Sequence, residues 1–559
     1  MNKITLLSAT LIGCFLFSTQ LFAQEDKLNV SGNIQGTFQT SKENTSIGSS
    51  DVPEKVLMNA FSNLRLNYKN LTLGMRFEYY NPPILGIDKS YEGEGISYLF
   101  ANYKIKDFDF TVGNFYDQFG SGLIFRSYEE RDLGYDNAMK GVHIKYQPKD
   151  GIQIKGFVGK QRLFWDLGPG YVRGIDGEIN LNSAFDIKKK MPNIDLGASL
   201  VSRYQENTNS LYNITENTHA YSLRMNSSYK GVNLEVEYTG KSQDPSSQND
   251  FKLNEGKALL INTSYSTKGF GASLSVKHLD NFDFRSDREA TGQNLLVNFN
   301  PALTRINTYA LATFFPYATQ NSGETGMMAE INYKVSKKTP VIGGMYITAN
   351  YSNSYKVKAV ATDSISTTND DKNFVIVKES VDLFSRAQNA DGSDYKLFEE
   401  FYIEGSKKIN KKLKLTAGYM YTLYNTKLNT GISTNNGDII YANFGVVEAK
   451  YKLKKRQTLR MELQHLATTQ VHSDSEGNWA QALIEYSKKG YFVAFQDLYN
   501  YGHSTNKVHY PTISAGFTNG VTKVSATYGQ QRAGIFCIGG VCRTVPASDG
   551  LTLTITSTF

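Results

Sequence analysis

The sequence predicts an all-β fold: a transmembrane antiparallel β-barrel of about 24 strands, with short periplasmic turns and long extracellular loops. Three observations predict it. Apolar and polar residues alternate in segments of about 10 residues, the length that a tilted membrane strand needs. Short connections alternate with long ones along the chain. The N-terminus has the pattern of a secretory signal.

We expect a signal peptide over residues 1–23. Lys3 precedes an apolar run from Ile4 to Phe17, and the small Ala23 precedes Gln24. This run is too short for a membrane helix, and no later stretch approaches the roughly 18 apolar residues that one requires. Lipoprotein cleavage at Cys14 is an alternative, which the apolar residues after that cysteine disfavour. Residues 24–559 are then secreted, periplasmic or, as we predict, one outer-membrane barrel domain.

Side-chain parity indicates the strands, because successive residues of a strand point to opposite faces. A soluble sandwich also alternates, but here the segments are long and many end in an aromatic residue, as at a membrane interface. In lipid every backbone group must be paired, so the sheet has to close. Typical apolar rows are Leu71, Leu73, Met75, Phe77 and Tyr79, then Val232, Leu234, Val236 and Tyr238, and later Leu459, Met461 and Leu463.

The connections are of two kinds. The short ones often carry lysine, and Lys230-Gly231 and Asn519-Gly520 are hairpin turn signals. A count of 22 or 26 strands stays open, because residues 305–315 fit either a strand or a loop. The long connections are expected near residues 41–58, 81–94, 119–138, 163–170, 206–218, 241–256, 284–322, 358–397, 427–437, 470–478, 502–508 and 532–549.

The last strand is expected to close the barrel against the first, which begins near Leu28. In GLTLTITSTF, the residues Leu551, Leu553 and Ile555 share one face, and threonines fill the other. With the terminal Phe559, this face resembles the C-terminal signal that the barrel-assembly machinery recognises. Pairing of the two end strands leaves no open edge.

Several function classes are excluded or disfavoured. The net charge is +7 and the basic residues are scattered, which argues against a nucleic-acid partner. The seven histidines show no metal-ligand spacing, and there is no nucleophile elbow or phosphate loop, so we expect no cofactor and no enzyme. A catalytic set assembled from separate strands stays open as a minor alternative.

The long loops supply the candidate lumen residues, because a barrel of this size is either a wide channel or plugged. Opposed charges on an inward loop would form a constriction, and charged rings set pore selectivity. An alternative is a surface loop with locally paired charges. The candidates are Arg126, Glu129, Glu130, Arg131, Asp132 and Asp136 on the first such loop, and Arg173, Asp176 and Glu178, which would meet them across the lumen. Residues 298–326, aromatic and low in charge, are a candidate plug or partner surface.

Cys537 and Cys542 lie in the last long loop, within FCIGGVCR. In an oxidising compartment we expect them to form a disulfide that staples the loop tip. Two cysteines without a nearby histidine are too few ligands for a metal site.

Three loop phrases resemble those of a known family: FGSGLIFRSYEERDLGYDNA, NPALTR with FPYATQNSGETG, and GIFCIGGVCR. They are similar to predicted outer-membrane barrel proteins of the Bacteroidota that carry a domain of unknown function. The resemblance spans the mature chain and implies the barrel and the compartment. It implies no catalytic or ligand residues.

Two functions are expected from these features. The first is a porin-like channel for small hydrophilic solutes. The second is a plugged barrel that serves as an accessory or structural subunit of an envelope protein complex. A TonB-dependent transporter is disfavoured, because its plug would occupy over a hundred residues before the first strand.

Overall fold

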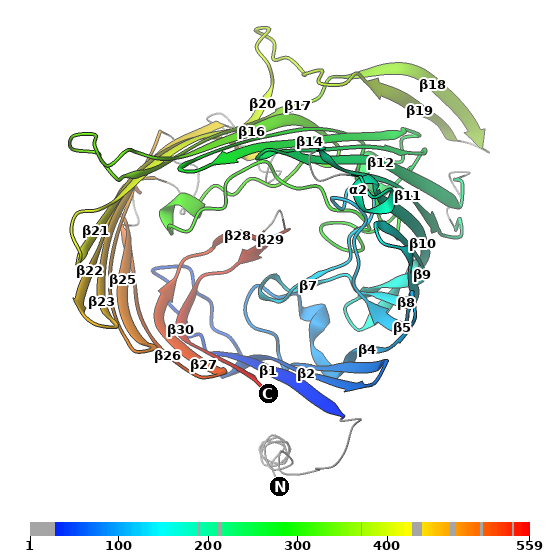
Figure 1. Ribbon diagram of the computed structural model, residues 1–559. Coiled ribbons are helices and arrows are strands. Elements are labelled where there is room, and N and C mark those ends of the chain that lie inside the picture. The colour runs from blue at the N-terminus through cyan, green and yellow to red at the C-terminus, as the bar shows by residue number, and fades with distance from the viewer. Residues whose placement is uncertain are drawn as a thin grey trace.

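A computed structural model shows a closed ring of strands seen nearly along the barrel axis (Figure 1). It describes residues 28–187, 191–208, 214–369, 372–427, 439–469, 477–503, 507–538 and 541–559. For the described residues within 361–380, 536–538 and 541–542, it describes only the backbone. The predicted signal peptide and Cys14 lie outside these residues.

Twenty-four antiparallel strands form the wall, as predicted. They are β1 (Asn29–Gln39), β2 (Leu57–Tyr68), β3 (Leu71–Tyr80), β4 (Gly93–Ile105), β5 (Phe108–Phe115), β8 (Met139–Lys149), β9 (Ile152–Leu163), β10 (Asp166–Asn180), β11 (Asn193–Tyr204), β12 (Asn217–Tyr229), β13 (Val232–Lys241), β14 (Gly256–Thr267), β15 (Phe270–Asp280), β16 (Gly323–Lys334), β17 (Tyr346–Lys356), β20 (Lys396–Lys408), β21 (Leu413–Asn425), β22 (Ile439–Lys454), β23 (Gln457–Thr468), β24 (Trp479–Lys488), β25 (Tyr491–Asn500), β26 (Val508–Asn519), β27 (Thr522–Gln531) and β30 (Ser548–Thr558).

The barrel closes where β30 pairs with both β1 and β27. Asn33 lies opposite Thr558, and the Phe559 and Gly32 backbones exchange two hydrogen bonds of 2.9 Å. Leu551 and Phe559 are exposed on the outer face, whereas Thr554 meets Thr37 at 3.4 Å between hydroxyl oxygens. The hydroxyl face of the last strand therefore lines the lumen, and both described chain ends lie at the short-turn end.

Shorter elements occupy the long-loop end. Three small hairpins are β6 (Glu129–Glu130) with β7 (Tyr135–Asp136), β18 (Ala359–Asn369) with β19 (Lys372–Val381), and β28 (Gly534–Ile538) with β29 (Val541–Val545). The first and third lie inside the ring, and the second lies outside it (Figure 1). Short helices at the same end are η1 (Lys89–Tyr91), η2 (Arg131–Leu133), η3 (Ser247–Asn249) and η4 (Leu311–Thr313), whereas α2 (Leu181–Ala184) lies at the short-turn end, in the connection from β10 to β11.

Three loop expectations are corrected or settled. Residues 163–170 are not a long loop, because β9 and β10 join through a tight turn at Phe164 and Trp165, and residue 166 already belongs to β10. The segment 358–397 contains the β18–β19 hairpin, so it is not only loop. Residues 305–315 form a loop with the η4 turn and add no strand to the wall.

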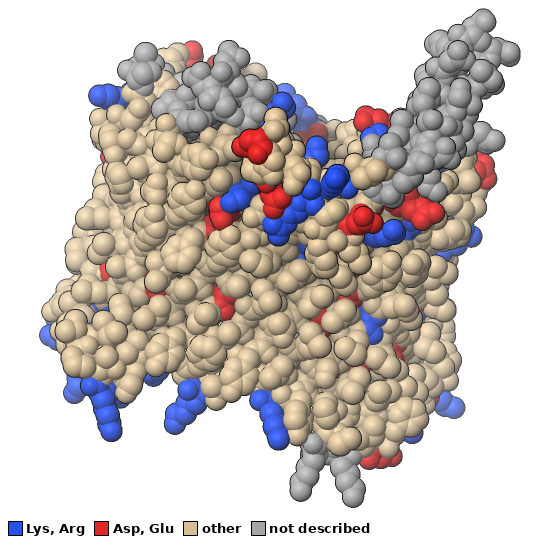
Figure 2. Space-filling view, turned by 90° about the horizontal axis from the view of Figure 1, so that it is seen from above, with Lys and Arg blue, Asp and Glu red and all other residues tan. Residues whose placement is uncertain are grey.

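The outer face carries the apolar parity of the strands. Large side chains such as Leu223 of β12, Leu463 of β23 and Phe495 of β25 are exposed there. Uncharged residues cover most of the wall visible in Figure 2, while Lys and Arg side chains protrude along its lower edge. A closed antiparallel barrel with an apolar outer band is the architecture of outer-membrane proteins, so the chain is an outer-membrane β-barrel. Within the described residues, helices are all too short or too polar to cross a bilayer.

Candidate functional site

The burial of lumen-facing side chains changes along the barrel axis. On β24, Trp479 and Gln481 are buried, whereas Leu483 and Glu485 on the same face are half-exposed. On β25, Leu498 is buried while Gln496 and Ala494, nearer the short turns, are half-exposed. The long-loop half of the lumen is therefore filled by loops along this stretch of wall, and the short-turn half is a vestibule.

The first inward segment runs from residue 116 to 138 and is anchored by apolar side chains. Phe119, Leu123, Ile124 and Phe125 are completely buried. The Phe125 ring stacks 4.2 Å from that of Phe157 on β9. This cluster also covers inward-facing residues of β10, β11, β12 and β14. Burial of this apolar surface, rather than charge, holds the segment against the wall.

A tight backbone approach fixes the same segment. Gly120 has a φ of +53°, and a Cβ atom there would collide with the Arg224 side chain of β12. The next amide, that of Ser121, donates to Glu237 Oε2 of β13 at 2.8 Å. Glycine therefore lets the loop backbone lie directly on the charged wall.

The second inward segment, residues 281–322, joins the first. Phe282, Phe284 and Val297 share its apolar cluster. The amide of Arg126 donates to the Val297 carbonyl at 2.8 Å, and that of Phe299 donates to the Gly122 carbonyl at 2.9 Å. Farther along, Leu311 and Ala312 pack in a second cluster with Phe444 and Trp479 on the opposite arc of the wall. The segment thus crosses from one side of the lumen to the other.

Ion pairs tie the first segment to β3 and β9. Arg76 contacts Glu129 and Asp136 of the loop, and its Nε lies 2.7 Å from Glu78 Oε1. Arg162 pairs with Glu78 at 2.6 Å and with Asp136 at 2.7 Å. Two guanidinium groups thus share three carboxylates, and nearly all of these groups are removed from solvent.

A second charged group lies along β10, β11 and β12. Arg224 Nη2 lies 2.6 Å from Asp176 and 2.9 Å from Glu178, and Ser199 donates to Asp176 at 2.7 Å. Farther around the wall, Lys277 of β15 pairs with Glu324 of β16 at 2.7 Å. These lumen charges are therefore already neutralised by neighbours.

Asp117 lies at the base of the first segment between two basic side chains. His143 Nε2 lies 2.7 Å from its carboxylate and Lys155 Nζ lies 3.3 Å away. Burial alone would raise the pKa of Asp117, but the hydrogen bond from His143 and the charge of Lys155 together lower it from 3.8 to about 2. The carboxylate is thus a charged anchor of the loop.

The predicted constriction residues separate into different places. Glu129, Arg131 and Asp136 join the Arg76 group, since Arg131 pairs with Glu129 at 2.8 Å. Asp176 and Glu178 join the Arg224 group and do not meet the loop charges. The remaining positions are as follows: Glu130 lies opposite Tyr135 in the β6–β7 hairpin, the Arg126 guanidinium lies against the Tyr128 and Phe299 rings, and Asp132 is exposed on η2.

The prediction that Arg173 faces the lumen together with Asp176 and Glu178 is wrong. Arg173 shares its parity on β10 with Tyr171 and Ile175, which are exposed on the outer face. Its Nη2 donates to Asn217 Oδ1 at 2.7 Å. Because β10 is regular here, residues 173 and 176 point to opposite faces, and only Asp176 faces the lumen.

A cavity of about 570 Å³ remains between the inward elements. Asp132 of η2 lines it, together with Arg305 and Asn307 of the second segment, Glu400 of β20 and Arg543 of β29. Glu400 accepts a weak hydrogen bond of 3.4 Å from Asn307. Burial lowers the pKa of Arg543, an effect that the nearby charge of Asp132 opposes. Acidic and basic groups thus lie together around one space.

Of this set, the sequence indicated Asp132 alone as a constriction residue. Arg305 lies within residues 298–326, the candidate plug, but was not predicted as a constriction residue, and Glu400 and Arg543 were not predicted at all. The parity of β20 is the one signal for Glu400, since it shares the inner face with Phe398 and Tyr402. No local pattern identifies Arg543.

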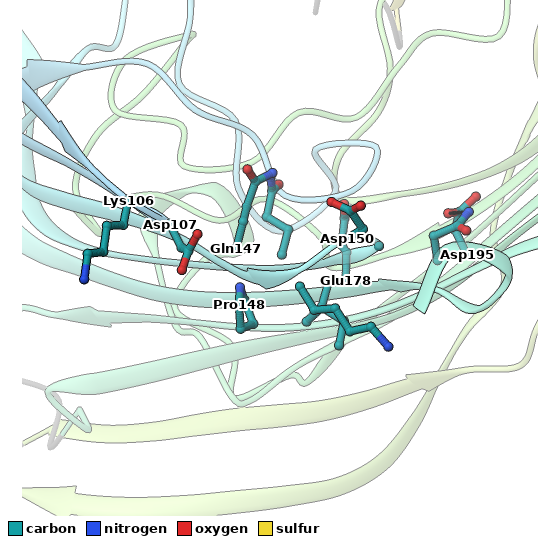
Figure 3. A pocket seen from close by; sticks show the side chains of 12 residues that line it. Lys106, Asp107, Gln147, Pro148, Asp150, Glu178 and Asp195 are labelled. Carbon is teal, nitrogen blue, oxygen red and sulfur yellow. Dashed lines mark hydrogen bonds between the residues drawn. The ribbon is translucent and has the colours of Figure 1, made fainter. Parts of the chain in front are cut away.

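A second hollow, of about 420 Å³, lies at the short-turn end (Figure 3). Glu178, which pairs with Arg224, is one of the residues that line it. The acidic side chains of this hollow come from different elements: Asp107 and Asp150 from turns, Glu178 from β10 and Asp195 from β11. Asn180 donates to Asp195 at 2.6 Å. In the described part of the chain, no three or more His, Cys, Asp or Glu residues are grouped so as to hold a metal ion.

The side chains of Cys537 and Cys542 lie outside the described residues. Their backbones are directly opposite each other in the β28–β29 hairpin. The predicted disulfide therefore stays a prediction.

Comparison with known proteins identifies the family. A family model described as a family of unknown function (DUF6029) matches residues 1–559. The chain belongs to the DUF6029 family. No curated protein matches it.

Solved structures similar to this DUF6029 protein share little sequence with it. A mutant of the ferric enterobactin receptor (PfeA) from Pseudomonas aeruginosa matches with a TM-score of 0.41 and 11% identity, over 95% of this chain and 81% of that one. The P pilus usher (PapC) translocation pore matches with a TM-score of 0.41 and 8% identity, over 95% and 99%. The copper transporter OprC matches with a TM-score of 0.39 and 8% identity, over 96% and 82%.

Proposed function

We propose that this DUF6029 protein is a channel for small hydrophilic solutes. Its narrowest part would be the cavity of about 570 Å³ lined by Asp132, Arg305, Glu400 and Arg543, called the central cavity below. The observation that carries the proposal is the set of opposed charges around that cavity, with Asp132 and Glu400 acidic and Arg305 and Arg543 basic. By contrast, Arg76, Arg224 and Lys277 are neutralised by acidic neighbours. A narrow passage that leaves both signs of charge facing it selects solutes by charge and polarity.

The vestibule fits the same function. Its wall near the barrel closure carries hydroxyl groups, including Thr554 beside Thr37, and Ser514, whose hydroxyl lies 2.9 Å from that of Thr527. Such a surface is wetted without holding a solute by strong charge. A hydrophilic molecule leaving the cavity would therefore meet a polar path with many hydroxyl groups at this part of the wall.

A sealed barrel is the second candidate, and one observation favours it. The two inward segments are joined by backbone hydrogen bonds and share a buried apolar cluster, so they form a fixed structure. A barrel closed in this way would serve as an accessory subunit of an envelope complex with a protein partner.

Planar-bilayer conductance distinguishes the two. The channel predicts steady single-channel steps, whose cation-to-anion selectivity shifts in opposite directions in Asp132→Asn and Arg305→Gln. Arg386→Gln is the matched control, because Arg386 is half-exposed and pairs with Asp394 outside the cavity. A silent membrane with insertion confirmed, or selectivity equal in all four proteins, contradicts the channel.

Biogenesis and source belong to the same proposal. Export by the signal peptide at residues 1–23, and insertion by the barrel-assembly machinery acting on Leu551, Leu553, Ile555 and Phe559, would bring the protein into the outer-membrane lipid. We also propose the extracellular disulfide and a source in the Bacteroidota.

A further inference from the structure

The central cavity is enclosed by parts of the chain that are far apart in sequence. Asp132 comes from η2, Arg305 from the second inward segment, Glu400 from the wall strand β20 and Arg543 from the β28–β29 hairpin. Each charge is thus presented from a different element. The volume of about 570 Å³ lies in the range of pockets for small organic ligands, about 300–1,000 Å³.

Three of these four side chains have polar atoms that are buried and have no hydrogen-bond partner among the described residues. These atoms are Arg305 Nη1, Glu400 Oε1, and Nε and Nη1 of Arg543. Glu400 as a whole is only 3% exposed. Elsewhere in the lumen Arg76 and Arg224 have several acidic partners each. Because an unsatisfied buried polar group is costly, unpaired charges gathered at one cavity indicate a ligand that completes them.

The orientation of the charges is set before any ligand binds. The Arg305 guanidinium lies 3.8 Å from the centre of the Tyr402 ring, which holds it in place by a cation–π contact. The other oxygen of Glu400 faces Asn307. Phe299, Ile306 and Phe315 add apolar surface to the same cavity. The site therefore offers fixed cationic and anionic groups beside a surface for an uncharged body.

We propose that this cavity binds a zwitterionic solute, an amino acid or a short peptide, with the ligand carboxylate at Arg543 and Arg305 and its ammonium at Glu400 and Asp132. The inference rests on the proposed channel, since it names the solute class of the same passage. The four side chains carry two charges of each sign, so a simple anion would face two carboxylates. A neutral sugar would give the four ionised side chains weaker hydrogen bonds than a zwitterion would. Hydrogen bonds that involve ionised groups are roughly twice as strong as neutral ones.

Isothermal titration calorimetry on the detergent-solubilised full chain tests the proposal with four probes. These are the dipeptide L-alanyl-L-phenylalanine, its N-acetyl derivative, its C-terminal amide, and glucose. The variants are Arg543→Gln and Glu400→Gln, with Arg386→Gln as control. Heat-modifiable migration on gels checks that each barrel is folded, and the probe series on the unmutated protein decides the outcome where a variant does not fold.

The free dipeptide is expected to bind, and loss of either charge on the dipeptide or of either side chain should weaken binding roughly tenfold or more. The control should bind like the unmutated protein. Absence of dipeptide binding, equal binding of all four probes, or tighter binding of glucose overturns the inference. Binding without conductance supports the site and contradicts the channel, whereas conductance without dipeptide binding contradicts the site alone.

Discussion

Phe125→Ala tests whether apolar packing holds the first inward segment against the wall. The Phe125 side chain has no exposed surface, and its ring lies 4.2 Å from Phe157 and 5.1 Å from Phe119. Truncation of a buried Phe to Ala costs about 3–5 kcal/mol. The cost falls on docking of the loop, because the wall strands are held independently by their own hydrogen-bond ladders. With a tenfold change for each 1.4 kcal/mol, the undocked population rises by roughly 10²- to 10³-fold or more.

Limited trypsin digestion of the folded barrel measures that population. Arg126 and Arg131 lie on the loop and are half-buried, so cleavage there requires the loop to leave the wall. When opening is fast relative to cleavage, the cleavage rate follows the open population. Phe185→Ala is the control, since Phe185 is 65% exposed in a connection at the short-turn end. A cleavage rate within a few-fold of the unmutated protein, or loss of the heat-modifiable barrel itself, would refute the reasoning.

Three further predictions concern charge, pH and redox state. Arg76→Ala leaves buried carboxylates without their cation and should lower the free energy of unfolding, measured by denaturant titration, by about 3–5 kcal/mol. Lys104→Ala removes an exposed ion pair and should change the same quantity by less than about 1 kcal/mol. Because the pKa of Asp117 is lowered from 3.8 to about 2, its carboxylate contributes roughly 2 kcal/mol to the free energy of unfolding. This contribution is complete above pH 4 and is lost as the pH falls toward 2. Thermal unfolding as a function of pH should show the loss in the unmutated protein and not in Asp117→Asn. Thiol titration of the unfolded mature protein should find no free thiol until a reductant releases Cys537 and Cys542, and two free thiols without reductant would exclude the disulfide.

The wall of this barrel follows from local sequence patterns. Alternation within β12 or β23 needs no knowledge of other strands, and the even strand count and the alternating connections follow from it. The error at residues 163–170 has a local cause. The Phe164-Trp165 turn lacks a glycine or asparagine signal, and Phe164 adopts a φ of +54°, which is unusual for an aromatic residue. Arg173 was grouped with Asp176 and Glu178 from composition alone, although residues 173 and 176 have opposite parity in a regular strand.

The charge partners depend on register, which a single sequence does not reveal. Arg76 and Glu129 are 53 positions apart, and Arg162 and Glu78 are 84 apart. Composition indicated that the charges of the first loop matter, but it could not show that the wall supplies their partners. The cavity is harder still, because its charges meet only after four elements have folded around it.

One signal for the filled lumen was nevertheless present in the sequence. A lumen wall that faces water is polar on its inner parity. Strand β14 departs from this rule, because Ala258, Leu259, Leu260 and Ile261 form a continuous apolar run, the pattern of a strand covered on both faces. Ala258 and Leu260 are the inward residues, and the phenylalanines of the loops cover them. Loss of alternation in the long-loop half of a barrel strand, while alternation persists toward its short turn, therefore predicts where a loop docks inside.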